Sequence, residues 1–369
     1  MRVIPFVKPV GGESAYLGQR EKRFNFSPPS KVNYHKYLEM IKVDPSEFTC
    51  NYKPWKYQLE PNSSCNLSCT MCAVSEWKTQ KRAPDLSLDQ FHTVIRENEC
   101  LLELNLCPLG EPLMRGDDYF EMGKFARSQE IWTRTVTNAT LLAVNENYKK
   151  MAAVGFNEIV ISIDSFDDAE YASIRRGSNL SKVLSNVELF HNHFVEQSIS
   201  IPTKLNAVLT TSNKDSLYKI IQGGVDLGFT NISITVDSFN WGIESFSKNN
   251  VYDQLDVNAL SAVSSDWGKQ GINVGYVLTT NRFLHKSPDL HQKCSWPFSS
   301  MYIGSDLRYP PCCHVGDPDV FEILPPQASS KDVCSPLEVW FSSSYDQFRR
   351  SHFSSGNLPD VCKACYVDQ

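Results

Sequence analysis

Short apolar runs alternate with helix-like segments along most of the chain after Trp55. Apolar runs of about four to eight residues predict strands, whereas apolar residues spaced three or four apart predict helices. The expected strands are residues 55–61, 101–107, 133–140, 158–165, 204–211 and 231–239. The expected helices are residues 87–99, 118–129, 145–155, 178–197, 215–228 and 258–271, with Ser87 as the N-cap of the first.

This alternation of strand and helix predicts parallel βα units rather than a β-sandwich. We therefore expect an α/β fold. The periodicity alone is compatible with an incomplete barrel and with a doubly wound open sheet. In both architectures, functional groups lie at the carboxyl ends of the strands.

The two ends of the chain differ from this central region. The N-terminal part is polar and irregular, and we interpret it as an extension with one short helix near residues 34–41. Near the C-terminus, residues 291–317 predict a β-hairpin that turns around residues 304–306, and residues 336–353 predict an amphipathic helix. The expected domains are residues 1–54, 55–285 and 286–369.

Composition excludes several classes of function. The net charge of −6 implies no basic surface for nucleic acid. No apolar run approaches the roughly 20 residues that span a membrane, and the N-terminal residues lack the features of a secretory signal. We expect a cytoplasmic protein without a nucleic-acid or membrane partner. In that reducing compartment, its 12 cysteines are expected to be metal ligands or redox groups rather than disulfides.

Three of these cysteines, Cys65, Cys69 and Cys72, directly follow the first expected strand with the spacing C-x₃-C-x₂-C. A structural zinc site needs four ligands, and no histidine lies close by in the sequence. Three thiolates can instead hold a cubane iron–sulfur cluster and leave one iron open. The alternatives are packing cysteines, or a zinc site completed by a distant ligand.

The triplet in this position resembles that of the radical S-adenosylmethionine (radical SAM) superfamily. Further matches follow in order: "LGEPLM" (109–114) is similar to the family's GEP-type motif, and "TNAT" (137–140) to its TNGT segment. "ISIDS" (161–165) and "IRRG" (174–177) resemble its fourth-strand and arginine elements. The resemblance covers about residues 55–277 and implies a partial (β/α)6 TIM-like barrel.

The resemblance also implies roles for individual residues. The triplet would hold a 4Fe-4S cluster that reductively cleaves S-adenosylmethionine (SAM), and the resulting 5′-deoxyadenosyl radical would remove a hydrogen atom from the substrate. The expected SAM-binding residues are Gly110, Glu111, Pro112, Asn138, Ser162 and Arg175, with Arg176 as the neighbouring alternative to Arg175. Glu111 and its backbone would bind the SAM amino group, and Ser162 and Arg175 the ribose or carboxylate. Met71 and Ala139 replace an aromatic residue and a glycine of many relatives, and both are mild changes.

A second set of cysteines lies near the C-terminus. Its order resembles the twitch form of the SPASM domains that are appended to many radical SAM enzymes. The resemblance implies an auxiliary 4Fe-4S cluster with four ligands: Cys294, Cys312, Cys362 and Cys365. Cys312 is preferred to Cys313 because its spacing from Cys294 matches a twitch dehydrogenase that oxidises an aminocyclitol.

The catalytic residues are not identified by these motifs. Cys107 and Cys313 are candidate hydrogen-atom donors, because radical epimerases use a cysteine thiol in that role. Asp164 and Asp237 are candidate bases or substrate contacts at strand ends. For each of these residues, packing, helix capping or loop hydrogen bonding is the alternative.

Two classes of substrate follow from the resemblance. The first hypothesis is dehydrogenation or epimerisation of a small polyol, sugar or aminocyclitol, with the auxiliary cluster as electron acceptor. The second is a peptide-modifying maturase that forms crosslinks or epimerised residues; the short, strand-poor extension before Trp55 disfavours it. A third hypothesis is a non-catalytic iron or zinc protein. The ordered motifs disfavour it. A flavodoxin- or ferredoxin-type protein would supply the electron in the first two cases.

Overall fold

The computed structural model describes residues 2–4, 21–77, 81–107, 109–236, 249, 251, 254–278, 294–325, 334–353 and 358–363. One sheet organises them, with the strand order β1-β8-β7-β6-β5-β4-β3-β2-β9. Every neighbouring pair is parallel except β1 and β8. The strands are β1 (Arg2–Ile4), β2 (Lys56–Leu59), β3 (Glu103–Leu106), β4 (Trp132–Thr137), β5 (Glu158–Ser162), β6 (Thr203–Val208), β7 (Asn231–Thr235), β8 (Asn273–Leu278) and β9 (Ser300–Ile303).

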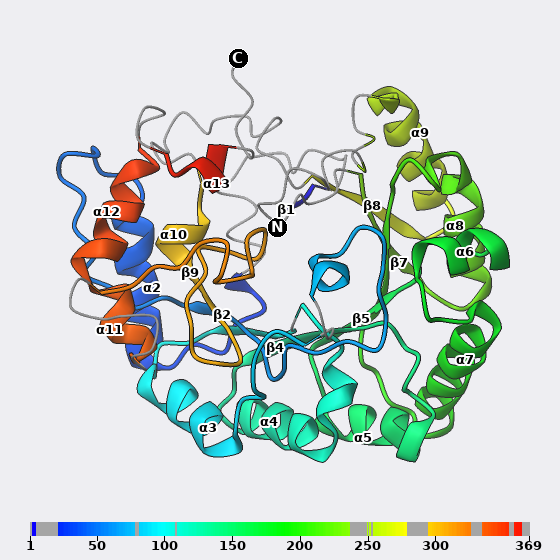
Figure 1. The fold of residues 1–369 in the computed structure, drawn as a ribbon, viewed down its shortest axis with the longest axis horizontal. Helices are drawn as coiled ribbons and strands as arrows, with labels where there is room; N and C mark the ends of the chain where they lie inside the picture. The colour runs from blue at the N-terminus through cyan, green and yellow to red at the C-terminus, as the bar shows by residue number, and fades with distance from the viewer. Residues whose placement is uncertain are drawn as a thin grey trace.

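Helices cover the outer side of this curved sheet (Figure 1). Those between successive parallel strands are α3 (Leu88–Glu97), α4 (Asp117–Ser128), α5 (Asn147–Val154), α6 (Asp168–Ile174), α7 (Leu180–Glu196), α8 (Leu217–Asp226) and α9 (Val257–Gly268). The remaining helices, near the two ends of the chain, are α2 (Pro28–Met40), α10 (Trp296–Ser299), α11 (Pro336–Trp340), α12 (Ser343–Ser351) and α13 (Asp360–Lys363). None of the helices in the described ranges is long and apolar enough to cross a membrane.

Local sequence explains where several of these helices begin and end. The Ser87 side chain accepts a hydrogen bond from the backbone N–H of Gln90, and the Gln90 side chain accepts one from Ser87 in return. This reciprocal capping box satisfies two N–H groups at the start of α3. Helix α5 ends at Gly155, whose φ of 71° lies in the left-handed region that glycine enters without strain.

The sheet has a buried apolar outer face and a polar inner face. Outward residues such as Ile161, Leu205 and Ile232 are buried in one core together with Val187 and Phe190 of α7. Successive strand residues point to opposite faces, so the inner face carries the alternate positions. In register across β2, β3, β4 and β5, these inner positions include Gln58, Asn105, Arg134 and Glu158.

The N-terminal extension joins the sheet to the C-terminal helices. Phe48 contacts the rings of Phe298 and Phe353, with centroids 5.3 Å away in both cases. The Trp340 indole N–H donates to the Tyr52 carbonyl at 2.8 Å. Residues 21–55 therefore contribute to the same hydrophobic core as the sheet and as α11 and α12.

The predicted α/β fold with an open, barrel-like sheet is confirmed, but with more strands than expected. Strand β8 follows the last predicted helix, and β9 pairs with β2 at the opposite edge of the sheet. The predicted β-hairpin of residues 291–317 is wrong, because in the described residues 294–317 only β9 is a strand and its partner is β2. The single helix predicted at 336–353 is two helices, since the Ser342 hydroxyl caps a new one, α12. The domain boundaries stay predictions.

Candidate active site

The cysteine triplet lies on the loop that leaves the carboxyl end of β2. Two backbone hydrogen bonds hold this loop against the segment after α6: Ser68 N–H donates to Arg176 O, and Thr70 N–H to Ile174 O, both at 3.0 Å. A third, from Cys72 N–H to Cys69 O at 3.1 Å, closes a turn inside the triplet. The loop conformation is therefore set by backbone contacts with the "IRRG" segment.

The loop after β3 approaches the cysteine loop so closely that Gly110 can carry no side chain. A Cβ atom there would lie 2.0 Å from Ser64 O. Glu111 N–H donates to the same Ser64 oxygen at 2.8 Å, and the Asn62 amide donates to Glu111 O at 3.1 Å. Glycine is thus required by close backbone contact rather than by a positive φ.

The Glu111 carboxylate is buried between these loops and the end of β4. It accepts hydrogen bonds from the Thr137 hydroxyl at 2.6 Å and from the backbone N–H groups of Asn138 (2.8 Å) and Leu113 (3.2 Å). Burial raises the pKa of Glu111 to about 7, although these bonds favour the charged form. The Glu111 side chain therefore holds the "TNAT" segment in place through hydrogen bonds. Its contact with the SAM amino group stays a prediction. Pro112 is buried at the start of the next 3₁₀ turn.

Asn138 links the "TNAT" segment to the first cysteine. Its amide nitrogen lies 3.1 Å from Asn66 Oδ1 and 4.0 Å from Cys65 Sγ. Leu67 N–H also donates to Cys65 Sγ, at 3.4 Å. N–H donors directed at a sulfur stabilise its thiolate form, as they do for cysteines that ligate iron.

A buried ion pair lies beside the second cysteine. Arg175 Nε is 2.7 Å from Asp164 Oδ2, and Asp164 Oδ1 accepts from Val208 N–H at 2.8 Å. Burial raises the pKa of the Cys69 thiol, and the positive charge of Arg175 opposes that rise. Asp164 thus orients a cation near the cysteine loop. Ser162, the last residue of β5, is buried two positions before Asp164.

The chemistry of the three thiols fits an iron–sulfur cluster. Burial raises the pKa of Cys65 and Cys72 to about 12, so bound metal is needed to hold them as thiolates at neutral pH. Among the residues that the structure describes, no group of three or more Cys, His, Asp or Glu side chains converges on one metal ion. A cubane does not require such convergence, because each thiolate binds a different iron.

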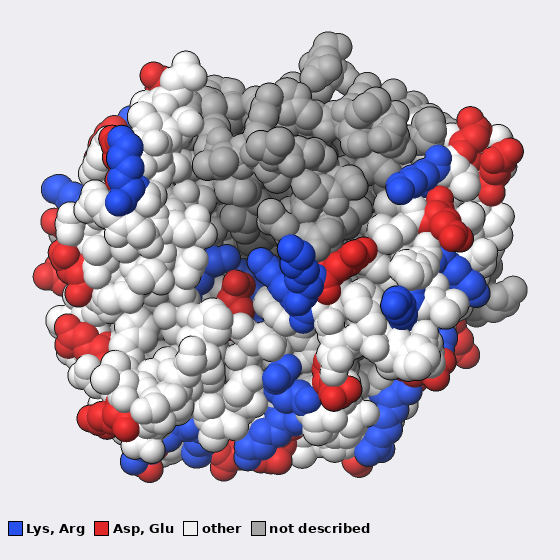
Figure 2. Space-filling model, turned by 180° about the vertical axis from the view of Figure 1, so that it is seen from behind, with Lys and Arg blue, Asp and Glu red and all other residues white. Residues whose placement is uncertain are grey.

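The inner face of the sheet carries opposed charges below the triplet. Glu158 lies 2.8 Å from Arg134 and 3.4 Å from Lys204, and Lys56 lies 2.9 Å from Glu103. On the outer surface seen from the side opposite to Figure 1, Lys and Arg also lie beside Asp and Glu near the middle of the described residues (Figure 2). The inner face of the sheet near the candidate site is therefore polar rather than apolar.

The two candidate hydrogen-atom donors, Cys107 and Cys313, both lie in the described part of the chain. Cys107 directly follows β3, and its N–H donates to Leu59 O at 3.3 Å. Burial raises the pKa of the Cys107 thiol to about 12, and Cys313 is near enough to raise it further. The role of each cysteine in hydrogen-atom transfer stays a prediction.

The proposed auxiliary ligands are described only in part. Cys294 and Cys312 are both near enough to Tyr345 to add to the rise in its pKa that burial causes. Cys362 is buried in α13 and belongs to the main core. Cys365 lies outside the described residues, as does Asp237.

A polar cluster that sequence reasoning missed lies next to the cysteine loop. Glu60, Arg82, Tyr302 and Asp306 meet there although they are far apart along the chain. One feature of the sequence could have indicated it: Glu60 directly follows the apolar strand β2, at a position where a carboxylate needs buried partners.

Comparison with known proteins identifies relatives of part of this chain. Residues 59–222 match the family model described as the Radical SAM superfamily. A GTP 3′,8-cyclase of Alkaliphilus oremlandii is 26% identical over 192 residues, which cover 50% of this chain and 58% of that protein. A PqqA peptide cyclase of Bradyrhizobium diazoefficiens is 23% identical over 197 residues, 52% of this chain and 49% of that protein. The chain thus matches about half the length of these curated relatives.

The fold extends this similarity over more of the chain. The structure of Streptococcus suis SuiB bound to its precursor peptide SuiA superposes with a TM-score of 0.63. The superposition covers 88% of this chain and 73% of that one, at 15% identity. At this identity the likeness establishes a shared fold.

Proposed function

We propose that residues 59–222, which match the Radical SAM family model, form a radical SAM domain, and that this chain is an enzyme that reductively cleaves SAM and abstracts a hydrogen atom from its substrate. One observation carries the proposal. Three thiols, one buried and two half-buried, share the loop after β2, and the loops after β3, β4 and β5 pack around them with the residues expected to bind SAM.

The thiols of Cys65, Cys69 and Cys72 are the donors for a 4Fe-4S cluster. With three cysteines and no further described ligand, such a cluster keeps one iron open. When bound, it would supply the electron that splits SAM into methionine and a 5′-deoxyadenosyl radical.

The protein groups around the thiols hold and orient SAM in this proposal. The backbone at Gly110 and Glu111 is fixed against Ser64, which places its polar groups beside the cysteine loop. The Asp164 carboxylate orients Arg175 near Cys69, so that its guanidinium can meet the SAM carboxylate. Asn138 and Ser162 complete the expected binding residues.

For the C-terminal segment we propose an auxiliary 4Fe-4S cluster held by Cys294, Cys312, Cys362 and Cys365. The order of these cysteines along the chain, which resembles that of a twitch domain, supports this assignment. A fully ligated cluster there would exchange electrons rather than bind SAM. A flavodoxin- or ferredoxin-type protein is the proposed reductant of the enzyme.

A small polyol, sugar or aminocyclitol is the first candidate substrate. Its hydroxyl groups match the polar inner face, where Gln58, Asn105 and Arg134 stand in register. Removal of a carbinol hydrogen atom, followed by transfer of the hydroxyl proton to a base or water and of one electron to the auxiliary cluster, would give a ketone. Return of a hydrogen atom from Cys107 or Cys313 would instead give an epimer. Asp164, the candidate base from the sequence, is paired with Arg175 and serves in this proposal to orient it.

A peptide is the second candidate substrate. The sequence similarity to a PqqA peptide cyclase favours it. A peptide backbone would also find hydrogen-bond partners on the polar inner face. The similarity to a GTP 3′,8-cyclase shows that related domains also act on nucleotides, so the sequence match alone does not separate small molecules from peptides.

The test is anaerobic cleavage of SAM by the full chain, reconstituted with iron and sulfide and reduced with dithionite. We expect 5′-deoxyadenosine from the wild type and none from the Cys65→Ala/Cys69→Ala/Cys72→Ala variant. Cys100→Ala, which removes a buried cysteine outside this loop, is the matched control and should retain the activity. Addition of polyol or peptide libraries should then accelerate cleavage with one class.

A wild-type protein with its full iron content that neither binds SAM nor cleaves it with any candidate substrate would contradict the proposal. Equal product from the triple variant would contradict the assignment of the cluster to these three cysteines.

A further inference from the structure

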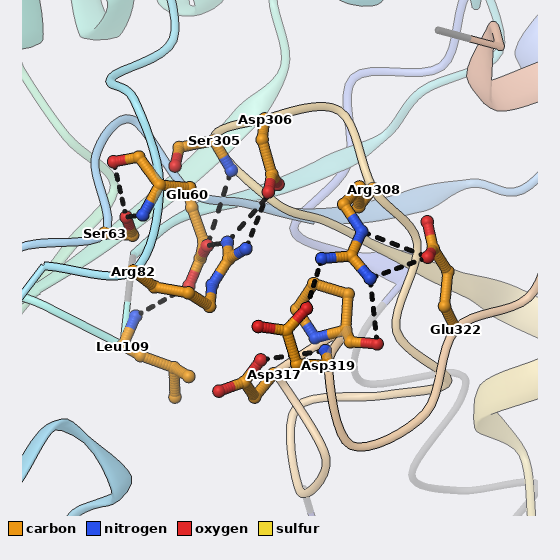
Figure 3. A network of polar contacts seen from close by, with 12 residues as sticks. Glu60, Ser63, Arg82, Leu109, Ser305, Asp306, Arg308, Asp317, Asp319 and Glu322 are labelled. Carbon is orange, nitrogen blue, oxygen red and sulfur yellow. Dashed lines mark hydrogen bonds and ion pairs between the residues drawn. The ribbon is translucent and has the colours of Figure 1, made fainter. Parts of the chain in front are cut away.

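One buried carboxylate, that of Glu60, joins three separate segments of the chain. Oε1 accepts hydrogen bonds from the Tyr302 hydroxyl at 2.7 Å and from Leu109 N–H at 3.1 Å. Oε2 accepts from Arg82 Nη2 at 2.9 Å and from Ser305 N–H at 3.4 Å (Figure 3). The Glu60 side chain has no exposed surface, so these four donors replace water for it.

Arg82 connects this carboxylate to a second one. Its two terminal nitrogens lie 2.7 and 3.3 Å from the two oxygens of Asp306, in a bidentate pair. Space around the pair is filled, because a Cβ atom on Gly304 would lie 2.7 Å from Asp306 Oδ1 and 3.1 Å from Arg82 Nη2. The buried charges of Glu60 and Arg82 are fully paired and hydrogen-bonded only when the segments that carry Leu109, Tyr302 and Asp306 are all in place.

The joined segments are those of the candidate active site. Glu60 begins the cysteine loop and Arg82 ends it, while Leu109 directly precedes Gly110. Tyr302, Ser305 and Asp306 belong to the segment between Cys294 and Cys312. Within the cysteine loop, the Trp77 indole N–H donates at 3.0 Å to Asp317, which lies five residues after Cys312.

We propose that Glu60, Arg82 and Asp306 form a positioning network through which the C-terminal segment 300–317 holds the cysteine loop and the Gly110 loop in their SAM-binding arrangement. The identity of the ligand rests on the proposed function. These residues act through the loops that they hold, and their loss lowers SAM affinity without removing a thiol ligand.

A neighbouring ion-pair group provides the matched control. Arg308 pairs with Asp319 and, at 2.8 Å, with Glu322 (Figure 3). Asp319 and Glu322 lie just after segment 300–317, and in the described part of the chain no ion pair or hydrogen bond of these three side chains reaches the cysteine loop. Arg308→Met therefore perturbs the same segment without cutting its connection to the loop.

The test compares Asp306→Asn, Tyr302→Phe and Arg308→Met in the full, reconstituted chain. SAM dissociation constants are measured by titration, the SAM-induced change in the electron paramagnetic resonance of the reduced cluster is recorded, and iron content is determined. We expect Asp306→Asn to weaken SAM binding about tenfold at unchanged iron content, because it breaks one charge-assisted contact. Tyr302→Phe, which leaves every charge paired, should weaken it severalfold, and Arg308→Met should leave it unchanged.

A second measurement uses the metal-free chain and does not depend on SAM. Iodoacetamide should label Cys65, Cys69 and Cys72 faster in Asp306→Asn than in the wild type or in Arg308→Met, because the loop is released. Unchanged SAM affinity in both Asp306→Asn and Tyr302→Phe would overturn the proposal, as would an equal loss in Arg308→Met. If Asp306→Asn fails to fold, the SAM affinity of Tyr302→Phe alone tests the proposal.

The two proposals fail in different ways. A wild-type chain that binds no SAM contradicts the proposed function, while the labelling rates still test the network. A wild-type chain that binds and cleaves SAM, with variants equal to it in affinity and labelling, contradicts only the network.

Discussion

Gly110 is the residue at which the smallest change should have the largest effect on the site. The oxygen of Ser64 would lie 2.0 Å from an added Cβ atom, and it belongs to the backbone, which cannot move without moving the cysteine loop. We predict that Gly110→Ala lowers the free energy of unfolding by about 1–3 kcal/mol through overpacking, and weakens SAM binding. Urea denaturation of the metal-free chain and SAM titration of the reconstituted chain measure the two effects.

Gly268→Ala is the control for Gly110→Ala. Gly268 is the last residue of α9, and a Cβ atom there would meet nothing within 4 Å. Its replacement should raise the free energy of unfolding by up to about 1 kcal/mol, since alanine is the better helix former. Equal stability losses in the two variants would show that the contact with Ser64 is not what excludes a side chain at Gly110.

Ala139 illustrates how a single residue can depart from a family pattern at a small cost. Its φ of 61° lies in the left-handed region, which explains why glycine suits this position. A non-glycine residue there costs about 1–2 kcal/mol. Ala139 N–H donates to the Thr137 hydroxyl at 3.1 Å, which holds the turn in this conformation.

Among the elements, α7 carries a histidine whose protonation should oppose folding. His191 Nδ1 lies 3.0 Å from Leu227 O and Nε2 lies 3.2 Å from the Thr203 hydroxyl. Burial lowers the pKa of His191 below its ordinary value of 6.5. The unfolded chain therefore binds a proton at His191 more readily than the folded chain does. As a result, the free energy of unfolding falls as the pH drops below about 6.5.

The corresponding prediction compares the wild type with His191→Gln. Between pH 7.5 and pH 5.5, the free energy of unfolding should fall more in the wild type, because glutamine does not titrate. Urea denaturation at the two pH values measures the difference, and His352 contributes equally to both chains. A variant that loses as much stability as the wild type would rule out a buried, neutral His191.

At the scale of the whole molecule, the N-terminal extension contributes structurally to two parts of the fold. Phe48 is buried against Phe298 and Phe353, and the Arg350 guanidinium donates to Phe48 O at 3.0 Å. We predict that Phe48→Ala lowers the free energy of unfolding by about 3–5 kcal/mol, as expected for loss of a buried aromatic ring.

The control for Phe48→Ala is Val195→Ala on the outer surface of α7. The Val195 side chain is 80% exposed, so its truncation should change stability by no more than about 0.5 kcal/mol. Urea denaturation of both variants provides the comparison. If Phe48→Ala were as mild as Val195→Ala, the extension would not be part of the common core.

The sequence predicted elements well where the relevant pattern is local. Each βα unit from β2 to β7 was expected, and the Ser87 cap is present, because period and capping depend on residues within one or two turns. The pairing of β9 was predicted wrongly, as a hairpin, because its partner β2 lies far away in the chain and its four residues are all buried. A buried strand has no alternating pattern that could indicate the partner.

The sequence by itself determined the order of strands and helices and the three thiols within one short loop, since both are properties of neighbouring residues. Only the tertiary structure decided what surrounds that loop. Glu60 lies 22 residues from Arg82 and 242 from Tyr302, and Arg82 lies 224 residues from Asp306. A buried carboxylate requires hydrogen-bond donors, but the sequence does not specify where in the chain they come from. The packing of β9 beside β2 brings these donors to Glu60.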